Sequence, residues 1–294
     1  MIHSAFRTKQ FLTLHLMLLS IVIFAQKNSI SNPLNEDIAA IDTIKGTWDM
    51  NMDLASRYIW RGQSWGGNYP VLQLYGNYAI NDKLSVGFWT TSNFKKEYFD
   101  TNGASKGYQE FDFVINYSPT DYLTVSLQDY YWPSTDRQEG ISNNFFNYGN
   151  DGSQSVDLQF LFDFSERKFP IWATLSTLIA GNDFRYEDEN DTKGKQNFTT
   201  YIEFGYKFEV PLAIELAPVI GFVVNNTAKY YSYADYDKPS FVNLGCKLSK
   251  EFLITEHFTM PIWVNYSYNA TATTTNLEPF GKQFLVLGTT LTYK

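Results

Sequence analysis

The feature that most constrains this chain is a two-residue periodicity that recurs, in segments of about ten residues, from Thr47 to the C-terminal end. In the first segment, Trp48-Asp-Met-Asn-Met-Asp-Leu54, apolar and polar side chains alternate. This alternation puts apolar side chains on one face of a strand and polar ones on the other. The pattern predicts strands at 47–60, 70–80, 83–92, 107–117, 122–132, 154–164, 169–180, 196–208, 212–224, 240–249, 257–268 and 282–293.

The connections between these segments alternate in length. Tight turns are predicted at 81–82, 118–121, 165–168, 209–211 and 250–256, and longer polar loops at 61–69, 93–106, 133–153, 181–195, 225–239 and 269–281. Short turns on one rim and long loops on the other are typical of a membrane barrel whose two termini are periplasmic. The sequence therefore predicts an all-β fold, a transmembrane antiparallel up-and-down β-barrel of about 12 strands.

Aromatic residues support this fold class. They make up 18% of the chain and gather at the predicted strand ends. The short-turn ends hold Trp48, Tyr78, Tyr117, Phe164, Phe208, Phe258 and Tyr293, and the long-loop ends hold Tyr58, Trp60, Tyr131, Tyr266 and Tyr268. Aromatic residues at both ends of spanning strands form the two interfacial girdles of a membrane barrel.

The N-terminal residues indicate the compartment. Arg7 and Lys9 precede an apolar run at 11–25 that ends in the small residue Ala25. This run is too short to cross a bilayer as a helix and has the length of a secretory signal peptide. We expect 1–25 to be a signal peptide, 26–46 a periplasmic lead-in and 47–294 the barrel, placed in the outer membrane of a Gram-negative-type cell.

Composition excludes several other classes of protein. The chain has 31 acidic and 23 basic residues, which argues against a nucleic-acid partner. Its one cysteine, Cys246, excludes an internal disulfide and a thiolate metal cluster. Of the three histidines, only His257 lies outside the predicted signal peptide, at the short-turn end of its strand. We therefore expect no catalytic residue, no metal and no cofactor. Replacement of His257 is expected to have almost no effect on function.

The inward polar faces supply the candidate pore-lining residues. They are Asp49, Asp53, Arg57, Arg61, Glu110, Asp112, Asp157, Asp163, Glu203, Lys207, Glu215 and Lys247. Eight of these are acidic and four basic, and an excess of one sign in a narrow lumen predicts mild cation preference. Arg57 and Arg61 are expected to share one inward cluster with carboxylates, with Glu110 or Asp112 within reach across the lumen.

Some residues depart from the simple pattern or leave alternatives open. Pro218 lies in the middle of an outward strand face and predicts a bulge. Asp129 also falls on an outward face, so we expect it at the outer rim rather than in lipid. The acidic run 187–191 could ligate calcium, although a solvated charge run fits its spacing better. The aromatic loop segments 145–148 and 230–233 could bind a ligand, plug the pore or pack on other loops.

One segment carries a family resemblance. The residues Ser56-Arg-Tyr-Ile-Trp-Arg-Gly62, followed by a polar loop and Pro70, resemble the opening of the TorF-like family of outer-membrane porins. That family begins with a strand end S-x-Y-x-x-R-G and a proline that opens the second strand. The later segments 108–112 and 129–131 are also similar. The resemblance covers chiefly the first third of the chain and departs at the C-terminus, where Lys294 follows the last aromatic. It implies a barrel and a pore, but no substrate.

Three functions follow from this sequence. The first is a porin-like channel for passive diffusion of small hydrophilic solutes. The second is a non-conducting structural or surface-binding barrel whose loops do the work. The third, a barrel hydrolase, is disfavoured because His257 is predicted at the wrong end of the barrel. The expected partners are outer-membrane lipid and lipopolysaccharide, small solutes, and the barrel-assembly machinery during biogenesis.

Overall fold

The computed structural model describes residues 46–95, 107–133, 141–164, 167, 170–225, 227, 230–231, 238–255, 258–271 and 282–293. No helix in this part of the chain is long and apolar enough to cross a membrane. The predicted signal peptide and nearly all of the predicted lead-in lie outside the described residues.

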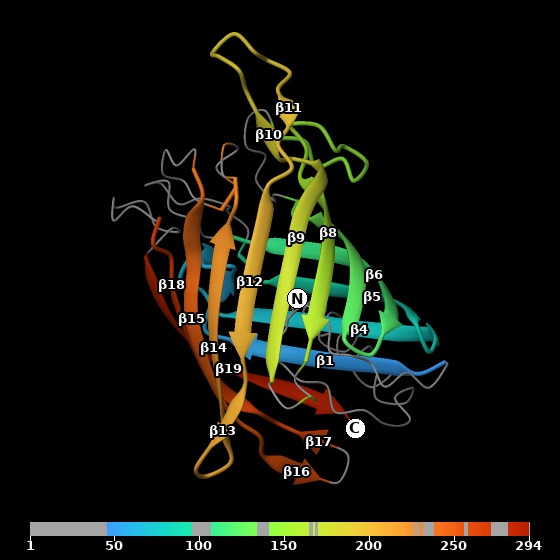
Figure 1. Cartoon of the computed structure of the whole chain (residues 1–294), viewed down its shortest axis with the longest axis vertical. Helices are drawn as coiled ribbons and strands as arrows, with labels where there is room; N and C mark the ends of the chain where they lie inside the picture. Colours follow the sequence, from blue (N-terminus) through green and yellow to red (C-terminus); the bar gives the residue numbers. More distant parts are fainter. Residues whose placement is uncertain are drawn as a thin grey trace, which may run out of the picture.

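Twelve long strands form the wall of the molecule (Figure 1). They are β1 (Trp48–Ala55), β4 (Val71–Asn81), β5 (Leu84–Ser92), β6 (Gln109–Thr120), β7 (Leu123–Tyr131), β8 (Gln154–Asp163), β9 (Ile171–Gly181), β12 (Thr200–Tyr206), β14 (Ile214–Val223), β15 (Ser240–Lys250), β18 (Ile262–Tyr268) and β19 (Gln283–Tyr293). Each pairs with the next one antiparallel, and β1 pairs with β19 from Asn51↔Thr292 to Ala55↔Gly288. This last pairing closes the barrel and confirms the predicted fold class.

The two rims of the barrel differ as predicted. On the short-turn rim, the Asn81 side chain accepts the backbone N–H groups of Lys83 and Leu84 at 2.9 and 3.0 Å, which fixes the turn between β4 and β5. Three short strands extend this rim, β13 (Phe208–Val210), β16 (Leu253–Thr255) and β17 (Phe258–Thr259). The long-loop rim, at the top of Figure 1, carries the hairpin of β10 (Phe184–Arg185) and β11 (Lys195–Gln196).

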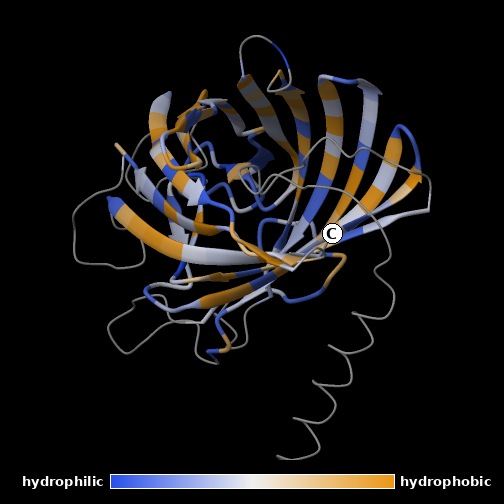
Figure 2. Ribbon diagram, turned by 90° about the horizontal axis from the view of Figure 1, so that it is seen from below, coloured by the Kyte–Doolittle hydropathy of each residue, from blue (hydrophilic) through white to orange (hydrophobic). Residues whose placement is uncertain are grey.

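The wall strands are apolar outside and polar inside. Hydrophilic and hydrophobic bands alternate along them (Figure 2). Exposed side chains of the outer face include Leu54, Phe113, Ile115, Leu127, Leu175, Phe204, Ile220, Leu248, Leu285 and Leu287. Buried side chains of the inner face include Asn51, Asp53, Gln73, Thr91, Glu110, Asn116, Ser126, Asp157, Ser176 and Thr290. A soluble domain has the reverse arrangement, so this chain is a barrel of the outer-membrane type, as the sequence predicted.

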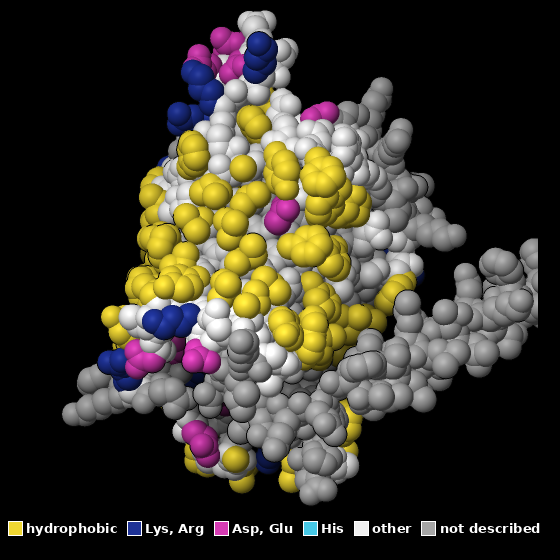
Figure 3. All heavy atoms as spheres, turned by 90° about the vertical axis from the view of Figure 1, so that its right-hand side faces the viewer, with side chains coloured by type: hydrophobic (Ala, Val, Ile, Leu, Met, Phe, Trp, Pro, Cys, Tyr) yellow, Lys and Arg dark blue, Asp and Glu magenta, His cyan; other side chains and the backbone are white. Residues whose placement is uncertain are grey.

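The outer surface repeats this division along the barrel axis. Hydrophobic side chains cover much of the flank in Figure 3, and most charged side chains lie toward its ends. At the short-turn rim Trp48, Tyr117 and Phe208 are exposed, and at the long-loop rim Tyr266 is exposed. These residues fit the predicted girdles, because aromatic rings favour the interface between lipid and water.

The predicted bulge at Pro218 is wrong. Pro218 pairs in register with Cys246, and the register of β14 and β15 shifts later, between Gly221 and Phe222. On its other side Pro218 lies in the gap between two stretches of pairing, Gly205↔Val219 of β12 and Phe208↔Leu216 of β13. A missing N–H is tolerated there because the neighbouring ladder is already broken, much as it is at a sheet edge.

Candidate functional site

A short hairpin leaves the wall after β1 and enters the barrel. The Ser56 N–H donates to Leu287 O of β19 at 2.8 Å, and the chain then turns away from the wall. The hairpin consists of β2 (Tyr58–Trp60) and β3 (Gln63–Trp65), which form a sheet separate from the barrel. We call residues 58–65 the lumen hairpin.

The turn of the lumen hairpin is set by two residues. Trp60 pairs with Gln63, so Arg61 and Gly62 form a two-residue loop, with φ values of 46° and 82°. Positive φ at both central positions is the type I′ turn, which matches the twist of a tight hairpin. This turn and the short alternating runs on either side of it are the local signal that the strand prediction missed.

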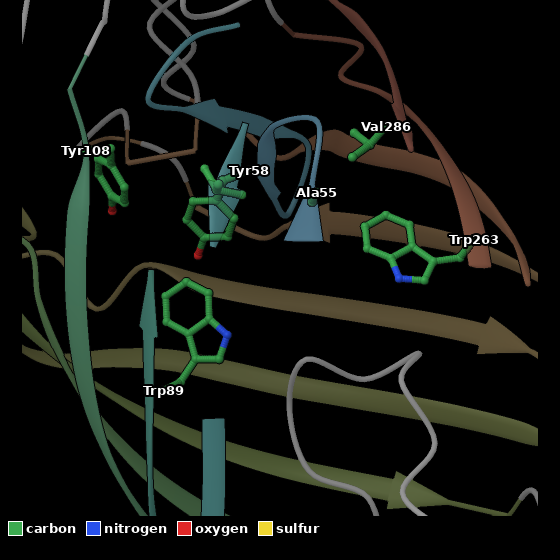
Figure 4. Packing of buried hydrophobic residues seen from close by; sticks show 7 residues of the cluster. Ala55, Tyr58, Trp89, Tyr108, Trp263 and Val286 are labelled. Atoms are coloured by element: carbon green, nitrogen blue, oxygen red, sulfur yellow. The ribbon is translucent and has the colours of Figure 1, made fainter. Parts of the chain in front are cut away.

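The predicted first strand is therefore wrong beyond Ala55, and Tyr58 and Trp60 do not belong to the outer girdle. Tyr58 is only 4% exposed. Its ring centroid lies 5.2 Å from that of Trp89 on β5 and 5.8 Å from that of Tyr108 (Figure 4). A Cβ at Gly62 would lie 1.9 Å from the carbonyl oxygen of Val242 on β15. The lumen hairpin thus reaches wall strands on different sides of the barrel.

Arg61 forms the central contact of the lumen hairpin. Its Nη1 lies 3.2 Å from Asp157 Oδ2, 2.8 Å from Ser176 Oγ and 2.6 Å from Tyr231 Oη. The side chains of Arg61 and Asp157 are 5% and 0% exposed. The guanidinium carbon lies 4.6 Å from the ring centroid of Trp60 and 4.8 Å from that of Tyr201. Arg61 is therefore held by a buried ion pair and by aromatic faces together.

Asp157, on the inner face of β8, accepts several other hydrogen bonds. Tyr130 Oη donates to Oδ2 at 2.9 Å, Gln159 Nε2 to Oδ2 at 3.0 Å, and Ser176 Oγ lies 2.7 Å from Oδ1. An ionised carboxylate has acceptor sites for all of these donors. Charge alone did not identify Tyr130, Gln159 and Ser176 in the sequence, because they are neutral members of the network.

Two tyrosines of the loop after β14 complete this cluster. The Tyr231 ring stacks at 5.4 Å on Trp60 and at 5.2 Å on Tyr201, and the Tyr230 carbonyl accepts from Gln63 Nε2 at 3.0 Å. Burial raises the pKa of Tyr231 well above its usual range, although the charge of Arg61 opposes this, so the hydroxyl stays protonated at neutral pH. Of the alternatives left open for 230–233, folding into the barrel is the one observed for Tyr230 and Tyr231; the other two residues lie outside the described residues.

The predicted shared cluster of Arg57 and Arg61 takes a different form. Because the chain turns inward, Arg61 pairs with Asp157 of β8 rather than with Glu110 or Asp112 of β6. The guanidinium of Arg57 lies 5.5 Å from the Phe284 ring of β19. Glu110, buried like its neighbour Asp112, accepts from Tyr108 Oη at 2.8 Å.

The remaining candidate residues lie on other wall strands. Glu203 of β12 accepts from Asn243 Nδ2 at 2.9 Å and from Tyr201 Oη. Glu215 of β14 interacts electrostatically with Lys207 and Lys247, and Lys247 interacts in the same way with Asp53 of β1. Asp49 of β1 accepts from Asn51 Nδ2 at 3.1 Å. Asp163, at the end of β8, is half-buried.

The acidic run 187–191 forms the tip of the β10–β11 hairpin. Asp191 accepts the backbone N–H groups of Glu187, Lys193 and Gly194 at 3.1, 3.2 and 2.9 Å. Its carboxylate therefore caps a turn. In the described part of the chain, no group of three or more His, Cys, Asp or Glu side chains is placed to hold a metal ion. His257 lies outside the described residues.

Comparison with known proteins finds no matching family model and no matching curated protein. The solved structures that are similar include the NanC porin (10% identity, TM-score 0.47), and this match covers 83% of the present chain and 99% of the porin chain. They also include the COG4313 outer membrane channel from Pseudomonas putida F1 (11% identity, TM-score 0.44), and this match covers 90% of the present chain and 99% of the channel chain. The match to the Salmonella typhi OmpF complex with daunomycin (10% identity, TM-score 0.37) covers 84% of the present chain and 97% of the OmpF chain. Likeness at this level assigns no substrate, and the TorF-like resemblance stays a prediction.

Proposed function

We propose that this protein is a porin-like outer-membrane channel for small hydrophilic solutes, in which the lumen hairpin forms the constriction. The observation that carries this proposal is the Arg61–Asp157 ion pair, held across the inside of a closed barrel with a polar inner face. Carboxylates, amides and hydroxyls on that face suit hydrated solutes. Apolar compounds would find few partners among them.

The charges of the inner face support a mild preference for cations. Arg61 is neutralised by Asp157, and Lys207 and Lys247 lie near Glu215. The candidate pore-lining residues outside the Arg61–Asp157 pair still include more acids than bases. A lumen about as wide as the Debye length, roughly 10 Å at 0.1 M salt, would not screen this excess fully.

A second candidate function is a barrel that does not conduct. It is favoured by the burial of Asp157 and Tyr231, both fully inaccessible to solvent at the level of the lumen hairpin. Barrels of about twelve strands lie between small ones filled by side chains and large ones that leave a channel. In this alternative the loops of the long-loop rim would carry the function. Outer-membrane lipid contacts the outer face in either case, and lipopolysaccharide and the barrel-assembly machinery are proposed partners.

Conductance of purified, refolded protein in a planar bilayer tests the proposal. The wild type is compared with a variant in which 58–65 is replaced by Gly and Ser, and with a matched control in which 184–196 of the β10–β11 hairpin is replaced in the same way. We expect small conductance steps from the wild type, larger steps without the lumen hairpin, and no change in the control. A zero-current potential across a salt gradient gives the sign of the selectivity.

Each result of this experiment is informative. Folding of each variant is checked by circular dichroism, and Arg61→Gln serves as a milder version of the hairpin replacement. Silence of all folded variants would contradict the channel and favour the non-conducting barrel. Anion preference would overturn the proposed selectivity and leave the channel itself in place.

A further inference from the structure

In the loop between β7 and β8, residues 141–152 lie against the outside of the barrel. Tyr131 Oη donates to the carbonyl of Asn143 at 2.8 Å, and the ring of Phe145 lies 5.0 Å from that of Tyr131 and 6.3 Å from that of Phe113. Phe113 is 51% exposed on the outward face of β6. The loop segment therefore rests on the apolar outer wall, unlike the lumen hairpin.

The same segment covers Asp129, a carboxylate on the outward face of β7 that we expected at the outer rim. Asp129 accepts from Tyr148 Oη at 2.8 Å and from Gln154 Nε2 at 2.9 Å. Burial and the charge of Asp129 raise the pKa of Tyr148 to about 12, so its hydroxyl remains a donor at neutral pH. A carboxylate that faces hydrocarbon is unfavourable, and these two donors satisfy its hydrogen-bonding capacity within the protein.

The loop is held in one shape by its own hydrogen bonds. The Ser142 N–H donates to Asp151 O at 2.6 Å, Asn147 Nδ2 donates to Asp151 Oδ1 at 3.0 Å, and Ser153 Oγ donates to Ser142 O at 3.0 Å. This frame presents Phe146 with 79% of its surface exposed, next to Phe145. An aromatic side chain fixed in this way loses little conformational freedom when it meets another apolar surface.

We propose that residues 141–152 form a membrane-contacting wing, which packs against the acyl chains of the surrounding lipid. The argument is continuity: Phe145 and Phe146 extend the apolar surface of Phe113 and Leu127, which already faces lipid in a membrane barrel. The hydrogen bonds that Asp129 accepts from Tyr148 and Gln154 lower the cost of placing this carboxylate beside the contact with lipid.

Spin labelling tests this proposal cleanly because the chain has one cysteine. Phe146→Cys and the control Tyr186→Cys, at the exposed residue that follows β10, are made with Cys246→Ser, labelled with a nitroxide and reconstituted into phospholipid vesicles. The parent protein labelled at Cys246, on the outward face of β15 opposite Pro218, is the lipid-facing reference. Relaxation by oxygen, which partitions into lipid, is compared with relaxation by a water-soluble nickel chelate.

We expect the ratio of oxygen to nickel accessibility at position 146 to be several-fold higher than at 186 and close to that at 246. Adding Tyr148→Phe, which removes the hydrogen bond to Asp129, should lower the ratio at 146. Nickel accessibility at 146 equal to that at 186 would overturn the proposal, because the wing would then lie in water. Protection of 146 from both reagents would also overturn it, in favour of a second copy of the chain covering the wing.

Discussion

Two hairpins leave the long-loop rim of this barrel and end in opposite environments. The lumen hairpin enters the barrel, where Tyr58 and Arg61 are buried. The β10–β11 hairpin projects away from the rim, and its Tyr186 is exposed (Figure 1). Both have positive φ at a glycine of the turn region, Gly62 in one and Gly194 in the other. Local backbone geometry therefore does not decide where a hairpin goes; the side chains that it carries do.

Each hairpin also takes part in an ion pair, the lumen hairpin with Asp157 of β8 and the β10–β11 hairpin between its own Lys195 and Glu187, and these two pairs differ in exposure. The side chains of Arg61 and Asp157 are 5% and 0% exposed, whereas those of Lys195 and Glu187 are 64% and 69% exposed. An exposed pair contributes about 0–1 kcal/mol to stability. A buried pair contributes little in sum, but loss of one partner leaves an uncompensated charge that costs about 3–5 kcal/mol.

The largest effect is expected from Asp157→Asn. This change leaves Arg61 buried without its counter-charge and should lower the free energy of unfolding by about 3–5 kcal/mol. The matched change in the β10–β11 hairpin (from here on the outer hairpin), Glu187→Gln, should lower the free energy of unfolding by less than about 1 kcal/mol. Equilibrium unfolding in urea, with the protein in detergent micelles, measures both. Equal losses in the two variants would show that the lumen hairpin is no better shielded from water than the outer one.

A double variant sharpens this comparison. Arg61→Gln combined with Asp157→Asn removes both charges and keeps polar side chains of similar size. We expect it to be more stable than Asp157→Asn alone, because no buried charge is left unpaired. Additive losses from the two substitutions would mean that the pair is not coupled.

The next effect in size is expected at the turn glycines. An alanine Cβ at position 62 would lie 1.9 Å from the Val242 carbonyl oxygen, so the lumen hairpin must move away from β15. At position 194 the nearest atom is Cε1 of the exposed Tyr186 ring, 2.9 Å away, which can swing aside. Both alanines cost about 1–2 kcal/mol for the left-handed backbone, and Gly62→Ala adds displacement of the lumen hairpin. We therefore expect Gly62→Ala to increase the conductance measured in a planar bilayer, and Gly194→Ala to leave it unchanged.

The sequence predicted the wall well because its alternation is a local property. Each spanning strand meets lipid on one side and the interior on the other, so its period is imposed along its whole length. The predicted segment 70–80 corresponds to β4, and 154–164 to β8. Boundaries were least accurate where a rim is extended by β13, β16 and β17.

The lumen hairpin was not predicted because its alternation imitates a wall strand. Tyr58 and Trp60 suit a lipid-facing girdle as well as a packed interior, so periodicity cannot distinguish the two. The partner of Arg61 is 96 positions away in the chain. That contact depends on how far the hairpin bends and on the closure of the barrel, which no short segment encodes. The turn residues Arg61-Gly62, between two short alternating runs, gave a local indication of the hairpin.

The smallest effect is expected from Asp191→Ala in the outer hairpin. Asp191 is half-buried in its turn, and its pKa is lowered chiefly by the backbone N–H of Gly194 and also by that of Glu187. A lowered pKa in the folded state means that this contribution is present at neutral pH and is lost as the pH falls through the lowered value. Asp191→Ala should therefore speed hydrogen exchange at the amides of Glu187, Lys193 and Gly194 at pH 7, and acidification of the wild type should do the same.

The barrel itself should not respond to Asp191→Ala, because the cap lies at the tip of a projecting hairpin and supports no wall strand. The unfolding midpoint and the conductance should match those of the wild type. Glu189→Ala is the matched control, since it removes an acid from the same tip that caps no backbone N–H among the described residues. Faster exchange in both variants would point to the charge of the tip rather than to the Asp191 cap. A changed conductance from Asp191→Ala would show that the outer hairpin takes part in the channel, and the contrast between the two hairpins would then fail.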